Sequence, residues 1–190
     1  MEVLEAINKR RANRSFEPIE VTNDLLHDLA SVAQIAPSCL NSQPWRFIFI
    51  YGKENIEKIL PALSKRNQVW IKHASLIIAV FSKVDNDCVI EEREYYLFDT
   101  GLASAFIILR ATELGLIAHP IAGFDEAKAK QLLKIPEDMR LITFINIGKK
   151  SNIVNPELSK PQKLGEKQRP PRKPLLKFVF INQYGDAINE

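Results

Sequence analysis

Two apolar runs constrain this fold more than any other feature of the sequence. Residues 75–82 read SLIIAVFS and residues 140–148 read RLITFINIG. The first run is short, continuous and rich in β-branched residues, which indicates a central strand, and the second is typical of a strand buried on both faces. Residues 46–51, RFIFIY, predict another two-sided strand. A short sheet built from such strands must be surrounded by helices.

The segments between these runs have the apolar periodicity or the end signals of helices. Residues 3–10 carry one apolar stripe, and a second helix begins behind Thr22 or Asn23 and stops near Ala36, because Pro37 disfavours helical geometry there. The remaining helices are expected over residues 54–66, with a break or kink at Pro61, over residues 90–114, with Gly115 as the stop, and over residues 125–134, with Asp125 as N-cap. The pattern predicts an α+β fold with a central mixed or antiparallel sheet.

Length and composition limit the classes of protein that this chain can represent. Its 190 residues are 46% hydrophobic, as expected for one globular domain covering residues 1–190. The sequence has no apolar run long enough to span a bilayer and no signal peptide, so a cytoplasmic protein is expected. Cys39 and Cys88 lack the spacing of a metal or disulfide framework and are expected to be reduced thiols.

The C-terminal part of the chain is unusual. Residues 149–174 are polar and contain five prolines, which predicts too little burial to hold them in place, yet residues 175–184, LLKFVFINQY, again resemble a strand. An extended arm over residues 149–190 that reaches the sheet edge of a second subunit would explain both features. A loose linker followed by a local edge strand is the alternative.

Positive charge is grouped at the two ends of the sequence. Arg10, Arg11 and Arg14 lie within five residues, and the tail carries Arg169, Arg172 and Lys173. Guanidinium groups match phosphate oxygens, so two of the first three could converge on one dianion, although a solvated charge run near a helix end is the alternative. The sequence has neither GxGxxG nor GxxxxGK[ST], which argues against a dinucleotide-binding Rossmann unit or a P-loop.

Three segments in this order resemble the nitroreductase family of FMN-dependent oxidoreductases. They are RRANRSF at residues 10–16, APSCLNSQPWRF at residues 36–47, and the stretch from ELGLIAHPIAGF to INIGKK at residues 113–150. The resemblance extends over essentially the whole chain and implies a nitroreductase-like fold. It also implies a homodimer with an FMN in each of two interface sites and a C-terminal arm that embraces the partner.

The resemblance assigns roles to residues on both sides of the flavin. Arg10, Arg11 and Arg14 would hold the phosphate and ribityl end, and Pro37, Ser38, Asn41 and Gln43 would line the flavin from the neighbouring subunit. Asn67 would lie near the pyrimidine edge, Ala122 and Gly123 near flavin N5, and Arg172, with Lys173 as the alternate, would close on the phosphate. Many relatives have a lysine where this chain has Trp70, so the resemblance does not carry charge-based tuning over to this position. Many also have an acid where it has Ala122, and the alanine leaves less polarity beside the ring.

The expected reaction is ping-pong hydride transfer from NADH or NADPH, through the flavin, to a nitroaromatic, a quinone or a similar acceptor. No side chain is needed as a general base, and His27, His73 and His119 are interpreted as structural or surface residues. Tyr95, Tyr96 and Phe98, at helical spacing, could shape the substrate mouth or belong to the core.

Other functions remain open at this point. The same fold also carries dehalogenases, flavin-fragmenting enzymes and dehydrogenases, and a flavin-binding or storage protein with little turnover is a further alternative. A nucleic-acid-binding module would need exposed aromatics among its basic residues, whereas the aromatics of this chain fall mainly in buried patterns. Neither a nucleic-acid partner nor a membrane partner is expected.

Overall fold

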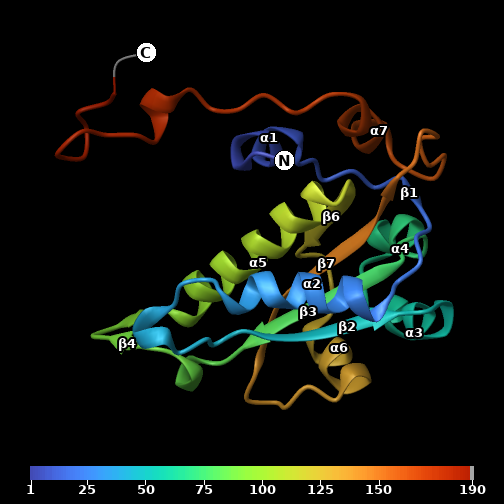
Figure 1. The fold of residues 1–190 in the computed structure, drawn as a ribbon, viewed down its shortest axis with the longest axis horizontal. Coiled ribbons are helices and arrows are strands. Elements are labelled where there is room, and N and C mark those ends of the chain that lie inside the picture. Colours follow the sequence, from blue (N-terminus) through green and yellow to red (C-terminus); the bar gives the residue numbers. More distant parts are fainter. Residues whose placement is uncertain (189–190) are drawn as a thin grey trace.

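A five-stranded antiparallel sheet forms the centre of the molecule in the computed structural model, which describes residues 1–188 (Figure 1). The strand order is β1-β7-β3-β2, and β6 also pairs with β7. The strands are β1 (Phe16–Glu17), β2 (Arg46–Tyr51), β3 (Leu76–Ser82), β6 (Leu116–Ile121) and β7 (Arg140–Lys150). Two short strands, β4 (Val89–Ile90) and β5 (Arg93–Glu94), form a separate hairpin. The antiparallel pairing confirms the predicted α+β class.

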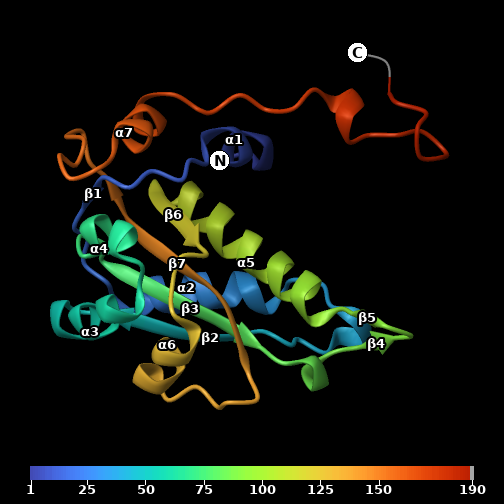
Figure 2. The same ribbon diagram turned by 180° about the vertical axis from the view of Figure 1, so that it is seen from behind.

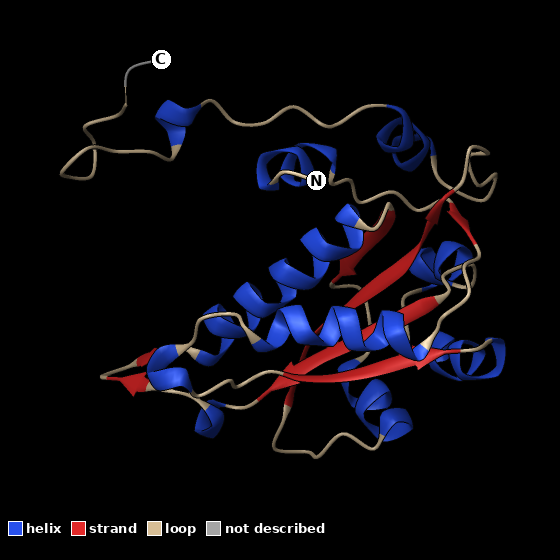
Figure 3. Ribbon diagram, in the orientation of Figure 1, coloured by secondary structure: helices blue, strands red, loops and turns tan. Residues whose placement is uncertain are grey.

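Helices cover both faces of the sheet, as the two-sided strands predict (Figures 2 and 3). Helices α2 (Asn23–Gln34) and α5 (Tyr96–Glu113) pack on one face, and α3 (Lys53–Ile59), α4 (Lys65–Ile71) and α6 (Glu126–Leu133) pack on the other. Two further helices, α1 (Val3–Lys9) and α7 (Lys160–Lys167), lie together beyond one end of the sheet.

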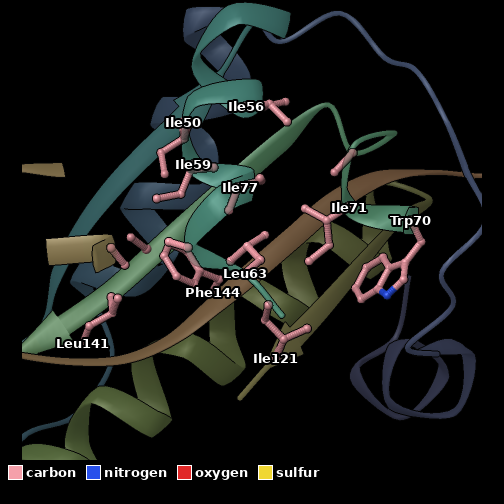
Figure 4. Packing of buried hydrophobic residues seen from close by; sticks show 14 of the residues in the cluster. Ile50, Ile56, Ile59, Leu63, Trp70, Ile71, Ile77, Ile121, Leu141 and Phe144 are labelled. Carbon is pink, nitrogen blue, oxygen red and sulfur yellow. The ribbon is translucent and has the colours of Figure 1, made fainter. Parts of the chain in front are cut away.

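Strand β3 separates two hydrophobic clusters. Its seven residues are all buried, with Ile77, Ala79 and Phe81 on the face of α3, α4 and α6, and Leu76, Ile78 and Val80 on the face of α2 and α5. The first of these clusters is shown in Figure 4. Because successive side chains of a strand point to opposite faces, one continuous apolar run supplies both cores. The central-strand prediction for residues 75–82 is confirmed.

The predicted helix ends are confirmed where a local signal defines them. The hydroxyl of Thr22 accepts from the N–H of Leu25, and the carboxylate of Asp125 accepts from the N–H of Lys128. The segment 54–66 is interrupted around Pro61 by a short 3₁₀ turn between α3 and α4. Gly115 has φ +76° directly after α5, a backbone conformation that glycine adopts without steric cost.

Two of the predicted elements differ in the structure. Strand β2 is not buried on both faces, because it lies at the sheet edge next to β3, and only one of its six residues, Ile50, is fully buried. Residues 90–95 are not helical, since Glu91 has φ +57° and residues 89–94 turn back on themselves as the β4–β5 hairpin. Helix α5 therefore begins only at Tyr96.

The C-terminal segment is anchored in its first half, contrary to prediction. Leu158 is buried, and so are Gln162 and Glu166 of α7, which begins with a capping box between Ser159 and Gln162. Beyond α7 the chain runs in an extended path away from the sheet (Figure 1). Residues 175–184 are not a strand within this chain, because they form a 3₁₀ turn and one isolated bridge from Phe180 to Ala187.

The prediction of two reduced thiols is wrong. Cys39 and Cys88 form a disulfide bond with their Cα atoms 6.0 Å apart. The fold brings them together across 49 residues, so no short spacing marks the pair in the sequence. Among residues 1–188, no helix combines the length and apolar character that crossing a bilayer demands.

Candidate functional site

Arginines from both ends of the chain surround one small cavity. The cavity has a volume of about 250 Å³ and lies between the segment after α1 and the segment around the end of α7. Its lining residues are Arg10, Arg11, Ala12, Arg14, Gly165, Arg169, Pro170 and Arg172. The structure therefore brings together the two basic groups that the sequence suggests. Lys173, predicted as the alternate to Arg172, is exposed and does not line this cavity.

Backbone contacts fix the arginine segment in place. Strand β1 pairs with the end of β7, Phe16 opposite Lys150, and this pairing holds the chain just after Arg14. The buried carboxylate of Glu166 accepts from the N–H of Arg14 at 2.7 Å and from the N–H of Ser15 at 3.2 Å. Helix α7 thus fastens to the same stretch of backbone from which the arginine side chains project.

Two further hydrogen bonds link the tail to the arginine segment. The guanidinium of Arg11 donates to the carbonyl of Gly165 at 2.8 Å. The guanidinium of Arg169 donates to the carbonyls of Asn8 and Arg10 at 2.7 and 2.8 Å, at the end of α1. These carbonyls lack partners within the helix, and a cation is favoured at a helix C-terminus. Arg169 therefore closes one side of the cavity.

The arginine side chains of this cavity are not paired with carboxylates within residues 1–188; the charge of Glu166 only partly opposes the lowering of the Arg14 pKa by burial. Among residues 1–188, none of the five lining arginines forms a salt bridge; the arginines that do so are Arg93, Arg110 and Arg140. Burial lowers the pKa of Arg10, and the charges of Arg169 and Arg172 act in the same direction. Such a cluster of like charges favours the binding of an anion, and guanidinium forks suit phosphate.

Trp70 forms the floor beneath the arginine segment. Its fully buried indole ring lies under the Arg14 guanidinium, whose carbon is 5.8 Å from the ring centroid. The centroids of the Trp70 and His119 rings are 4.7 Å apart. The Nδ1 atom of His119 lies 3.0 Å from the carbonyl of Asn13. Burial lowers the pKa of His119 to about 4, so this imidazole is neutral at pH 7. His119 is buried structure, as predicted, whereas His27 and His73 are exposed.

Helix α4 also connects the arginine cavity to Gly123. The amide of Asn67, one turn before Trp70, donates to the carbonyl of Gly123 at 3.1 Å. A Cβ atom on Gly123 would lie 2.8 Å from Asn67 Nδ2 and 3.0 Å from Ser64 Oγ, so the absence of a side chain permits this contact. The predicted residues Asn67 and Gly123 are thus adjacent, with Ala122 exposed beside them.

The 37–43 loop lies at the opposite end of the molecule. It is linked through Cys39 to the segment before β4, which both views place far from α1 and α7 (Figures 1 and 2). Pro37 and Asn41 are exposed, and Ser38 and Gln43 are half-buried. Within one chain, these four predicted residues therefore do not meet the arginine cavity. Of the aromatic residues near this end, Tyr96 is buried and Phe98 is 64% exposed.

Sequence reasoning missed two supporting residues of the arginine cavity. Arg169 was visible as part of the basic tail, but nothing distinguished it from Arg172. Glu166 was not singled out, because an acid inside a basic, proline-rich tail resembles a solvated charge. No signal in the sequence shows that its partners are backbone N–H groups.

The family model described as "Nitroreductase family" matches residues 7–80 and 63–149 of this chain. The chain belongs to the nitroreductase family, which confirms the resemblance and, with it, the expectation of an oxidoreductase of this class. A Bacillus subtilis (strain 168) protein, provisionally named NAD(P)H nitroreductase YdgI, is 26% identical and matches over 77% of this chain and 87% of its own length.

Two other relatives extend the comparison. A protein of Methanothermobacter thermautotrophicus, provisionally named NADH dehydrogenase/NAD(P)H nitroreductase, is 31% identical over 78% of this chain and 77% of its own length. A solved structure described as an oxidoreductase containing FMN superimposes with a TM-score of 0.82 at 25% identity, over 94% of this chain and 91% of that one. The predicted nitroreductase-like fold is confirmed.

Proposed function

We propose that this protein is an FMN-dependent oxidoreductase that uses NADH or NADPH to reduce a nitroaromatic, a quinone or a similar acceptor. The observation that carries the proposal is the cavity of five arginines without carboxylate partners, adjacent to α4. The names of the similar proteins agree with it, since they include NAD(P)H nitroreductases and an oxidoreductase containing FMN. The redox chemistry would be that of the flavin, which accepts and returns a hydride, while the protein supplies position and electrostatics.

The arginines gathered from the two ends of the chain fit the phosphate-bearing half of FMN. Arg10 and Arg14 line the cavity without a salt-bridge partner among residues 1–188, and Arg172 lines it from the tail. A phosphate dianion would relieve the repulsion among these groups and accept bidentate hydrogen bonds. Asn67, one turn before Trp70 in α4, and the backbone at Gly123 would then lie toward the ring system.

The other half of the site would come from a second copy of the chain. Ser38, Asn41 and Gln43 supply a hydroxyl and two amides, which suit the alternating donors and acceptors of a flavin edge. Their loop lies at the opposite end of the chain's fold from the arginine cavity, so the two groups would serve the same flavin only across two subunits (Figures 1 and 2). A homodimer is supported by the extended tail and by exposed apolar residues of α1, since Val3 and Leu4 are 70% and 68% exposed.

No buried acid or base is required for the proposed reaction. The one histidine beside the arginines, His119, is held by the Asn13 carbonyl and is neutral at pH 7 because burial lowers its pKa to about 4. The side chains of this site would therefore bind and orient rather than transfer protons.

The test is a visible spectrum of the purified protein, followed by anaerobic addition of NADH or NADPH. We expect flavin bands that bleach with one of the two donors and recover with a nitroaromatic or a quinone. Bands that persist with both donors would favour flavin storage or a dehydrogenase with another donor. A colourless protein that takes up no FMN on titration would refute the proposal.

A matched pair of variants tests the arginine cavity directly. Arg10→Gln should weaken FMN binding roughly 10- to 100-fold, because a charged hydrogen-bond donor to phosphate is lost. Arg140→Gln removes the same charge from the exposed start of β7 and should leave FMN affinity unchanged. Equal effects of the two variants would show that net charge, and not this cavity, determines binding.

A further inference from the structure

The disulfide bond connects the 37–43 loop to a distant part of the chain. Cys39 lies inside the loop, and Cys88 directly precedes β4. The carbonyl of Cys88 accepts from the N–H of Tyr95 at 3.1 Å, immediately before α5 begins. Neither cysteine is fully buried, so a small reductant has access to this region. The loop is therefore joined covalently to the segment that enters the hairpin, and through one backbone hydrogen bond to the start of α5.

The backbone of this loop is held in an unfavourable conformation. Leu40, Asn41 and Gln43 have φ values of +49°, +58° and +48°, in the left-handed region of backbone conformation that residues other than glycine rarely adopt. Several residues with positive φ values so close together persist only where contacts with the surrounding structure hold the backbone in that conformation. Here the noncovalent restraints include the N–H of Cys39, which donates to Asp99 Oδ2 at 2.6 Å, and the N–H of Gln43, which donates to Ser38 Oγ at 3.0 Å. The disulfide is the covalent restraint.

The surroundings of the disulfide also suit the two free thiols. One oxygen of Asp87 accepts from the N–H of Cys88 at 2.8 Å, and the other oxygen is buried without a hydrogen-bond partner among residues 1–188. The two sulfurs and one carboxylate oxygen of Asp87 all lie within 4.8 Å of one another. A thiol formed by reduction could donate to the Asp87 carboxylate, which would partly compensate for the loss of the covalent bond.

We propose that Cys39 and Cys88 form a redox switch that controls the 37–43 loop and, through it, the affinity for flavin. The oxidised pair holds the strained loop in the conformation of the structure, with Ser38, Asn41 and Gln43 arranged as one wall of the site. Reduction releases the loop toward ordinary backbone conformations and weakens this wall. The inference rests on the proposed function, because it assigns these residues to flavin binding.

The chemistry of the switch is thiol–disulfide exchange with a dithiol reductant. A thiolate of the reductant attacks one sulfur, the Cys39–Cys88 bond breaks, and the second thiol of the reductant then resolves the mixed disulfide. Two electrons and two protons pass to the cysteine pair, and the reductant leaves as its own disulfide. In a compartment that keeps thiols reduced, such a bond is expected to be transient and regulatory.

The experiment compares oxidised and reduced protein in three measurements. Dithiothreitol is the reductant and is removed anaerobically by desalting; alkylation followed by mass spectrometry counts the free thiols. Hydrogen exchange of residues 37–44 reports the loop, and fluorescence titration gives the dissociation constant for FMN. The control is the double variant Cys39→Ser/Cys88→Ser, which should behave like reduced protein and ignore dithiothreitol.

We expect no free thiols in air, two after reduction, faster exchange confined to the loop, and FMN binding weakened by about fivefold or more, the usual scale of coupling between sites. Free thiols in air-oxidised protein would overturn the proposal. So would equal loop exchange and equal FMN affinity in the two redox states. If the loop responds but FMN binds in neither state, the proposed function fails while the redox response of the loop stands.

Discussion

Replacing Glu166 with alanine should show how firmly the tail is attached to the arginine segment. Its carboxylate accepts from the N–H of Arg14 and from the N–H of Ser15, at 2.7 and 3.2 Å. Alanine leaves both donors without this partner, and an unsatisfied buried donor costs about 1–3 kcal/mol. The N–H of Ser15 is buried and that of Arg14 is partly buried, so a total of about 3 kcal/mol is expected.

The measurement is urea unfolding at one fixed protein concentration, because association would otherwise change the apparent stability. With a slope of about 2.5 kcal/mol/M, a loss of about 3 kcal/mol lowers the midpoint by just over 1 M. Glu166→Gln keeps one acceptor oxygen and should lose about half as much free energy. Hydrogen exchange at Arg14 and Ser15 should accelerate in the alanine variant.

Glu157→Ala is the matched control for this prediction. Glu157 lies in the same tail, but it is exposed and pairs with Lys72 at the surface, a contact worth about 0–1 kcal/mol. If Glu166→Ala lowers the free energy of unfolding no more than Glu157→Ala does, then water replaces the carboxylate and the tail is not held through these two N–H groups.

Three further changes test other parts of the structure. Gly123→Ala should cost about 1–3 kcal/mol in thermal unfolding, because the new Cβ displaces the Asn67 amide 2.8 Å away; an unchanged melting temperature would contradict this close contact. The pKa of His119 falls from 6.5 in the unfolded chain to about 4 in the folded one. As the pH drops below 6.5, the unfolded chain therefore binds the proton first, and the free energy of unfolding should decrease toward pH 4 by at most about 3 kcal/mol. Urea unfolding at several pH values should show a smaller loss for His119→Gln, and an unchanged pH profile would refute this origin. Arg110→Lys loses the two-nitrogen contact with Asp28 that ties α5 to α2 and should cost about 1 kcal/mol, less at 1 M salt; equal costs at low and high salt would argue against an electrostatic origin.

Much of the fold could be predicted because its signals are local. The N-caps at Thr22 and Asp125, the break at Pro61 and the stop at Gly115 each depend on residues within one or two turns. The central strand at residues 75–82 could be predicted for a related reason, since an apolar run of that length needs cover on both faces. In these cases a few neighbouring residues determine the conformation.

The missed elements depend on contacts between distant residues. Ile90 is apolar like the helix that follows, but the turn at Glu91 and the strand β5 lie between it and the start of α5 at Tyr96. The β4–β5 hairpin is linked to Cys39 through the disulfide at Cys88, and nothing near residue 88 in the sequence shows this. Local preference is a weak guide where tertiary contacts oppose it.

The residue types of the candidate site could be predicted from the sequence, but the contacts that hold these residues together could not. Arginines suit an anion wherever they lie, but the basic groups were ambiguous by themselves, and the family resemblance is what assigned Arg10, Arg14 and Arg172 to a phosphate. What brings them together is Glu166, whose charge is directed at backbone N–H groups and not at the guanidiniums. A carboxylate bound to the backbone anchors the tail without occupying the guanidinium donors, so the arginine side chains remain available to an anion. Its charge also acts on Arg14, where it opposes the lowering of the pKa by burial. One buried acid therefore both holds the segment and offsets part of the positive charge gathered there.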